Sequence, residues 1–152
     1  MSVADCLLRD AHATERFGMR LAVIAQPGDV IALSGPLGAG KTCMARGLLA
    51  ALGLTGDAPS PSFAIVQPYD PPETSFPILH VDLYRVEHGN ELAELGLDEA
   101  QSASLLIVEW PERAGPDYWP QALWLTIEIL ADGARRSTAQ VPASWEARWP
   151  RI

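Results

Sequence analysis

The chain has 152 residues, of which 48% are hydrophobic and 20% are charged, a composition typical of a folded globular domain and not of a disordered segment. Its formal net charge of −8 argues against tight binding of RNA or DNA by the chain alone, because such binders normally present a basic face. No apolar run is long enough to cross a bilayer and no signal-peptide pattern opens the chain, so we expect a cytoplasmic protein without membrane contact.

The first part of the chain predicts a strand, a helix and a second strand. Residues 6–8 form a short apolar run, as expected for a strand. Residues 10–25 carry apolar side chains at helical spacing, and Pro27 and Gly28 follow as the stop signal. Residues 29–34 have the apolar character of a buried strand, which ends where a glycine-rich segment begins.

That glycine-rich segment, Gly35–Thr42, matches the phosphate-binding loop G-x-x-x-x-G-K-[ST] at every fixed position. Its glycines let the backbone curl so that successive N–H groups converge on a phosphate. Lys41 would reach the β- and γ-phosphates, and the Thr42 hydroxyl would hold Mg²⁺. Residues 43–52 predict a helix whose N-terminal dipole faces the anion. The segment predicts that this chain binds a nucleoside triphosphate. The loop residues expected to contact it are Gly35, Leu37, Gly38, Ala39, Gly40, Lys41 and Thr42.

The remaining residues predict the other elements of one domain. Residues 53–61 are rich in Gly, Pro, Ser and Asp and predict a loop, and residues 68–72 predict a turn. Residues 89–97 predict a helix whose leucines point inward. Further strands are predicted at residues 62–69, 76–82, 105–109 and 123–130.

The character of two of these strands predicts the architecture. Residues 105–109 are apolar up to a final acid, which is typical of a central parallel strand covered on both faces. Residues 123–130 alternate, as expected near a sheet edge. We expect Trp145 and Trp149 to pack back onto the domain. The chain therefore predicts a single domain over residues 1–152, a three-layer α/β P-loop NTPase fold with a mixed, mostly parallel sheet.

Two predicted strands end in an acid, Asp82 and Glu109. Ligands collect at the carboxyl ends of strands in open α/β sheets, and Mg²⁺ requires a hard anionic ligand. One acid could hold the metal while the other orients or deprotonates the attacking water, although an acid at a strand end can also serve only as a cap or an ion-pair partner. His80 could shuttle a proton, but a histidine inside an apolar strand favours a hydrogen-bonded core residue.

Four motifs occur together in one order and carry a resemblance. They are the phosphate loop, Ser60–Phe63 (Ser-Pro-Ser-Phe), His80–Arg85 (His-Val-Asp-Leu-Tyr-Arg) and Glu109–Glu112 (Glu-Trp-Pro-Glu). From about residue 14 to residue 136 the chain resembles the TsaE (YjeE) family, the bacterial P-loop ATPase of tRNA threonylcarbamoyladenosine (t6A) synthesis.

The resemblance implies roles for individual residues. Thr42 and Glu109 would be the Mg²⁺ ligands, with Glu109 in place of the commoner Walker B aspartate. Lys41, Asp82 and Glu109 would be the catalytic residues, with Asp82 near the γ-phosphate. Trp110 would lie beside the site.

The resemblance also implies contacts around the nucleotide. Residues 60–63 would form a switch loop over it, and Thr14 would lie near the adenine. Arg135 or Arg136 matches a C-terminal basic position that could touch the nucleotide, and Arg136 is the one we assign.

The activity implied is that of an ATPase using Mg²⁺ and ATP to drive the cycle of a complex with TsaB and TsaD, with tRNA met only through that complex. Two alternatives remain open. A small-molecule kinase could use the same loop, but it would need an acceptor pocket and an arginine-rich lid. A binding module with negligible turnover could use ATP only to order residues 60–63.

Overall fold

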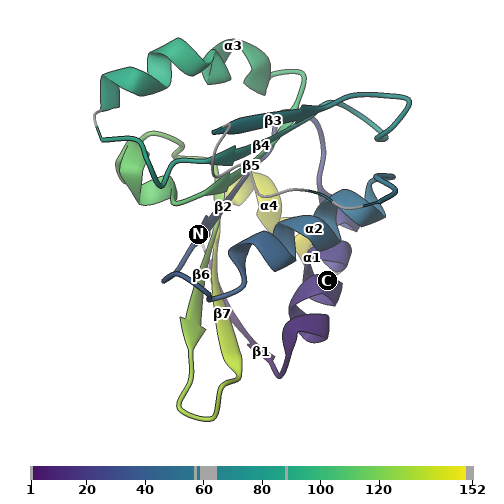
Figure 1. The fold of residues 1–152 in the computed structure, drawn as a ribbon, viewed down its shortest axis with the longest axis vertical. Helices are drawn as coiled ribbons and strands as arrows, with labels where there is room; N and C mark the ends of the chain where they lie inside the picture. Colours follow the sequence, from purple (N-terminus) through teal and green to yellow (C-terminus); the bar gives the residue numbers. More distant parts are fainter. Residues whose placement is uncertain (1, 57, 59–64, 88, 150–152) are drawn as a thin grey trace.

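The computed structural model describes residues 2–56, 58, 65–87 and 89–149 (Figure 1). The strands are β1 (Ser2–Leu8), β2 (Val30–Ser34), β3 (Val66–Tyr69), β4 (Ile78–Asp82), β5 (Leu105–Glu109), β6 (Leu123–Ile129) and β7 (Arg135–Val141). The helices are α1 (Ala11–Ile24), α2 (Lys41–Ala51), α3 (Leu97–Gln101) and α4 (Ala143–Glu146), with the 3₁₀ helices η1 (Gly89–Leu95) and η2 (Pro111–Ala114). In the described part of the chain, no helix combines the length and the apolar composition that crossing a membrane requires.

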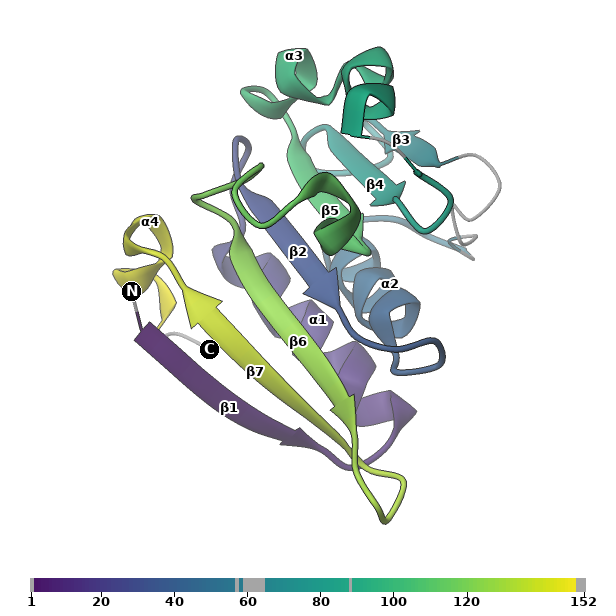
Figure 2. The ribbon, with the colours of Figure 1, turned by 90° about the vertical axis from the view of Figure 1, so that its left-hand side faces the viewer.

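The strands form one seven-stranded mixed sheet in the order β1-β7-β6-β2-β5-β4-β3 (Figure 2). Its centre is parallel, because β2 pairs with β5 and β6, and β5 pairs with β4. Its two edges are antiparallel, through β1 with β7, β7 with β6, and β3 with β4. Only β7 and β3 run against the other five strands. The prediction of a mixed, mostly parallel sheet is therefore confirmed.

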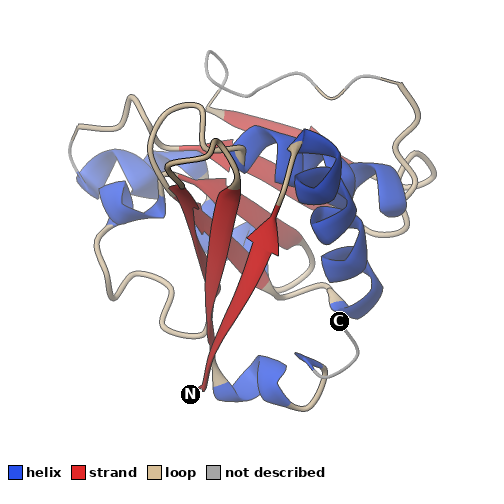
Figure 3. Ribbon diagram, turned by 90° about the horizontal axis from the view of Figure 1, so that it is seen from below, coloured by secondary structure: helices blue, strands red, loops and turns tan. Residues whose placement is uncertain are grey.

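Helices cover both faces of this sheet, as Figure 3 shows from below. In β2, Ile31 and Leu33 pack in the cluster that includes side chains of α1, α2 and α4. Val30 and Ala32 pack in the opposite cluster, with side chains of η1 and α3. Every residue of β5 is buried, as predicted for a central strand. The strands that end at the site are therefore held from both sides, which confirms the predicted three layers.

Two glycines let α1 and α2 approach so closely that their backbones touch. A Cβ atom at Gly47 would lie 2.0 Å from the Glu15 carbonyl oxygen, and one at Gly18 would lie 2.1 Å from that of Met44. Any larger side chain would push the helices apart, because a backbone atom cannot yield as a flexible side chain can. The close approach brings Thr14 of α1 to the first turn of α2, where its methyl group lies 3.4 Å from a Cβ built at Gly40.

The N-terminal half follows the predicted elements closely. The helix predicted at residues 10–25 is α1, capped by the Asp10 side chain, which accepts a hydrogen bond from the Ala13 N–H at 2.8 Å. The strand predicted at residues 6–8 is too short, because β1 begins at Ser2 and pairs along its whole length with β7. Of the strand predicted at residues 62–69, residues 62–64 lie outside the described residues, and β3 occupies 66–69.

The C-terminal half departs from the sequence-based expectations in three places. The helix predicted at residues 89–97 is two pieces, because Gly96 adopts a left-handed conformation (φ 70°) between η1 and α3. The strand predicted at residues 123–130 is β6, which is not an edge strand, because β2 and β7 flank it and β1 lies beyond β7. The strand β7 was not predicted, since its outward positions are polar and its inward ones are small. The expected packing of the tail is confirmed for Trp145, which is fully buried, and Trp149 packs against the same cluster.

Candidate active site

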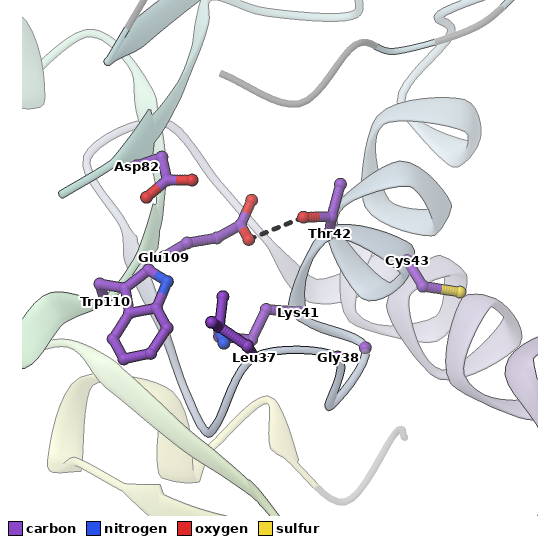
Figure 4. Close-up of a pocket in the computed structure, with 9 residues that line it drawn as sticks. Leu37, Gly38, Lys41, Thr42, Cys43, Asp82, Glu109 and Trp110 are labelled. Atoms are coloured by element: carbon purple, nitrogen blue, oxygen red, sulfur yellow. Dashed lines mark hydrogen bonds between the residues drawn. The ribbon is translucent and has the colours of Figure 1, made fainter. Parts of the chain in front are cut away.

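The loop between β2 and α2 lies at the carboxyl end of the central strands and borders a cavity of about 260 Å³ (Figure 4). Gly35, Gly38 and Gly40 have φ values of 150°, 77° and 109°. A Cβ atom at Gly35 would lie 2.6 Å from the Ile127 carbonyl oxygen, so the loop could not follow this path with a larger residue there. The cavity is lined by Leu37, Gly38, Gly40, Lys41, Thr42, Cys43, Asp82, Glu109 and Trp110.

The Lys41 side chain is held over its own loop. It is 5% exposed, and its Nζ donates hydrogen bonds to the carbonyl oxygens of Gly35 at 2.6 Å and Pro36 at 3.0 Å. The ammonium group also lies 4.2 Å from the centroid of the Trp110 ring. Burial lowers the pKa of Lys41 below its ordinary value, and the carboxylates of Glu109, Glu112 and Asp82 oppose that shift. The site thus holds a largely desolvated amine at the loop that would receive a phosphate.

Thr42 and Glu109 meet directly across the cavity. The Thr42 hydroxyl donates a hydrogen bond of 2.8 Å to Oε1 of Glu109, drawn as a dashed line in Figure 4. Parallel pairing of β2 with β5 sets Glu109 opposite Leu33, at the point where β2 enters the loop. A hydroxyl and a carboxylate are the hard oxygen donors that Mg²⁺ takes beside phosphate oxygens and water. The two residues therefore fit a Mg²⁺ site with the expected ligands.

His80 supports Glu109 from the next strand. It is 0% exposed, and its Nε2 lies 2.7 Å from Oε2 of Glu109, which is itself 2% exposed. His80 does not line the cavity. The interpretation of His80 as a hydrogen-bonded core residue is confirmed.

Asp82 ends β4 directly beside the end of β5. Register pairs Asp82 with Glu109, and both line the cavity. Asp82 is 6% exposed, and its Oδ1 accepts a hydrogen bond of 2.9 Å from the Tyr84 N–H. Burial raises the pKa of Asp82 above its ordinary value and Glu109 adds to the rise, while the Tyr84 N–H, His80 and Lys41 act against it. A carboxylate that folding makes harder to ionise is a better proton acceptor than an exposed one.

We expect Asp82→Asn to unfold at a higher temperature than the unaltered protein at about pH 7. The pKa of Asp82 is higher in the folded chain than in the unfolded one. Between these two pKa values the folded state binds more protons than the unfolded state, so the protein loses stability as pH rises through that range. Asparagine carries no charge to bury and still accepts from Tyr84. The difference should vanish below about pH 3, where an ordinary aspartate is protonated. Thermal unfolding followed by circular dichroism at both pH values tests this, and a lower midpoint for the variant at about pH 7 would contradict it.

A second cavity, of about 160 Å³, borders the same loop and shares Gly38, Gly40 and Cys43 with the first. Thr14, the residue expected near the adenine, lines it and is 2% exposed, with its hydroxyl donating to the Asp10 carbonyl oxygen at 3.2 Å. Arg135 lines it too and donates to the loop carbonyl oxygens of Ala39 (from Nε) and Gly38 (from Nη2), each at 3.1 Å. The residues predicted to contact the nucleotide therefore border two cavities that have part of the loop in common.

The two arginines at the start of β7 diverge because side chains alternate along a strand. Arg135 is half-buried against the loop, whereas Arg136 is exposed and lies on the opposite face. The structure thus brings Arg135 to the loop and does not bring Arg136, the residue assigned in the sequence analysis. The alternation of side chains along a strand would have indicated that the two arginines lie on opposite faces, but only if β7 had been recognised as a strand.

Trp110 lies beside the cavity, where the resemblance implied. It has a left-handed backbone (φ 60°) at the start of η2, and its ring centroid lies 4.9 Å from that of Tyr84. Glu112, for which the sequence predicted no separate role, accepts a hydrogen bond of 2.7 Å from the Ser34 hydroxyl just before the loop. The expected switch segment, residues 60–63, lies outside the described residues.

Comparisons with known proteins match this chain along most of its length. The sequence profile of the family described as "Threonylcarbamoyl adenosine biosynthesis protein TsaE" matches residues 8–138. The tRNA threonylcarbamoyladenosine biosynthesis protein TsaE of Treponema pallidum is 31% identical over 88% of this chain and 97% of its own length. The protein of that name from Bacillus subtilis is 35% identical over 82% of this chain and 77% of its own length.

A third relative and a solved structure agree. The TsaE of Streptomyces coelicolor is 44% identical over 62% of this chain and 65% of its own length. The crystal structure of YdiB from Bacillus subtilis superposes with a TM-score of 0.80 and 28% identity, covering 97% of this chain and 90% of that one.

Proposed function

This chain belongs to the TsaE family of t6A biosynthesis, and from that premise we propose that its part in the pathway is to bind and hydrolyse Mg-ATP. The observation that carries the proposal is the meeting of Thr42 and Glu109 at 2.8 Å, beside a buried Lys41 and within the phosphate-binding loop. The amine of Lys41 and the hydroxyl of Thr42 at the start of α2, together with the Glu109 carboxylate at the end of β5, are groups of the kind that phosphoryl transfer from a nucleotide uses.

We assign roles in hydrolysis to individual side chains at the cavity. Bound to Thr42 and Glu109, Mg²⁺ would neutralise charge on the phosphates. Lys41 would exchange its loop carbonyls for phosphate oxygens. Water would attack the γ-phosphorus, the bond to the bridging oxygen would break, and ADP and phosphate would leave. We assign the orientation and deprotonation of that water to Asp82, because its carboxylate faces the cavity and its pKa is raised by burial.

We propose that the turnover drives the cycle of a complex with TsaB- and TsaD-like proteins in the cytoplasm. Membership of a tRNA-modification family supports a role within that machinery. The net charge of −8 supports contact with tRNA through the partners and not through this chain alone.

The experiment measures phosphate release and t6A together. Purified protein with Mg-ATP, alone and with TsaB- and TsaD-like partners, is expected to release phosphate without any small-molecule acceptor. Cells depleted of the protein are expected to lose t6A from tRNA and to regain it with the unaltered gene. Appearance of a phosphorylated small molecule in place of free phosphate would favour a kinase and overturn the proposal, as would unchanged t6A after depletion.

A further inference from the structure

We propose that His80 is the positioning residue of the metal site, donating a hydrogen bond that holds the Glu109 carboxylate in the orientation that Thr42 and Mg²⁺ require. The inference deepens the proposed function and rests on it. His80 does not line the cavity, so it acts through Glu109 and not on the nucleotide.

The strand register makes the contact between the two side chains possible. His80 pairs with Ile107 across β4 and β5, and Glu109 lies two residues further along, on the same face of the sheet. Diagonal neighbours on one face lie within reach of long side chains. The same face carries Ile78 and Leu105 into the cluster packed beneath α2, the helix that supplies Thr42. His80 therefore reaches Glu109 from the neighbouring strand β4, while Thr42 reaches it from the first turn of α2.

The two oxygens of Glu109 have one donor each among these neighbours. The Thr42 hydroxyl donates to Oε1 at 2.8 Å, and His80 Nε2 lies 2.7 Å from Oε2. A carboxylate that holds Mg²⁺ is ionised and only accepts hydrogen bonds, so in the proposed arrangement Nε2 carries the hydrogen of this contact. Two donors on opposite oxygens fix the rotation of the carboxyl group about its last bond. Residues that orient a metal ligand in this way contribute to metal affinity without touching the metal.

Burying the His80 ring costs free energy, which the hydrogen bond to Glu109 offsets. Its ring is 0% exposed, and its Nδ1 has no hydrogen-bond partner among the residues that the structure describes. Burying an unpaired polar atom costs free energy, and an apolar side chain at this inward position of β4 would avoid that cost. The hydrogen bond to Glu109 is the interaction that a histidine here supplies and an apolar residue could not.

Two variants separate hydrogen-bond donation from the filling of space. His80→Gln keeps an N–H donor at the distance of Nε2, whereas His80→Met fills similar volume without a donor. Binding of a non-hydrolysable ATP analogue is measured by calorimetry in EDTA and then across a series of Mg²⁺ concentrations. We expect His80→Met to bind the analogue normally in EDTA but to need about 10- to 100-fold more Mg²⁺ for the metal-dependent gain in affinity. His80→Gln should stay close to the unaltered protein.

Each remaining outcome has one meaning. If the unaltered protein shows no Mg²⁺-dependent binding, the proposed function fails and this inference fails with it. If it does, and His80→Met has the same Mg²⁺ requirement, only the positioning role is overturned. Equal losses for His80→Met and His80→Gln, or a loss in EDTA as well, would mean that His80 matters for packing alone. Should His80→Met not fold, His80→Asn replaces it, because its shorter amide cannot reach Glu109.

Discussion

Lys41→Ala is expected to reduce ATP hydrolysis about 100- to 1,000-fold, the range seen when one preorganised charge-stabilising donor is removed. The reason lies in the balance of charge around the cavity, where Asp82 and Glu109 are both buried. Without the ammonium group, these carboxylates would face a negatively charged nucleotide with no cationic side chain left among the described residues that line the cavity. We therefore also expect weaker nucleotide binding with or without Mg²⁺. Phosphate release and calorimetry with an ATP analogue measure the two effects.

Arg46→Ala is the matched control for Lys41→Ala. Like Lys41→Ala, this substitution removes one positive charge from α2. The Arg46 side chain is exposed and lies outside the cavity, with its Nε donating a hydrogen bond to the Ala58 carbonyl oxygen. It should leave hydrolysis nearly unchanged, since a charge in solvent is screened. Nucleotide binding by Lys41→Ala as tight as that of the unaltered protein would show that the loop does not hold phosphate through this lysine.

The sequence located the glycine-rich turn between β2 and α2 and the two acids that line the cavity beside it, for a physical reason. A loop that presents its backbone to an anion needs glycine where φ is positive or the backbone packs closely, as at Gly35 and Gly40. An apolar run that ends in a single acid, such as the one closing on Glu109, can be read as a buried strand with its ligand at the carboxyl end. These are local constraints, so spacing along the chain was enough to find them.

What depends on pairing between distant segments could not be predicted in the same way. Recognition of β7 required knowing that it pairs with both β1 and β6, because its own residues are mostly polar or small. The choice between Arg135 and Arg136 depended on that strand's face. The hydrogen-bond partner of His80 could not be predicted either. Glu109 is 29 residues away in sequence, and only the register of β4 and β5 brings the two side chains together.

Glu109→Gln is expected to lower ATP hydrolysis by about two to three powers of ten while leaving Mg²⁺-free nucleotide binding intact. Stabilisation of developing charge by a bound metal is worth several kcal/mol, and each ~1.4 kcal/mol is a factor of ten in rate. Glutamine has the shape of glutamate and can still accept from the Thr42 hydroxyl, so the loop should keep its form. What is lost is the anionic charge that a magnesium ion requires. Turnover and analogue binding, each measured with Mg²⁺ and in EDTA, separate the two.

Glu109→Gln and Lys41→Ala alter two residues that border the same cavity, but we expect their effects on nucleotide binding to depend differently on Mg²⁺. Lys41→Ala should weaken binding in EDTA, whereas Glu109→Gln should weaken it only where Mg²⁺ contributes. Glu109→Asp is the control that keeps the charge. Its shorter side chain cannot meet both Thr42 and His80 at their present distances of 2.8 and 2.7 Å, so we expect partial turnover that rises with added Mg²⁺. Full activity of Glu109→Gln would show that the metal, if one is used, does not depend on this carboxylate.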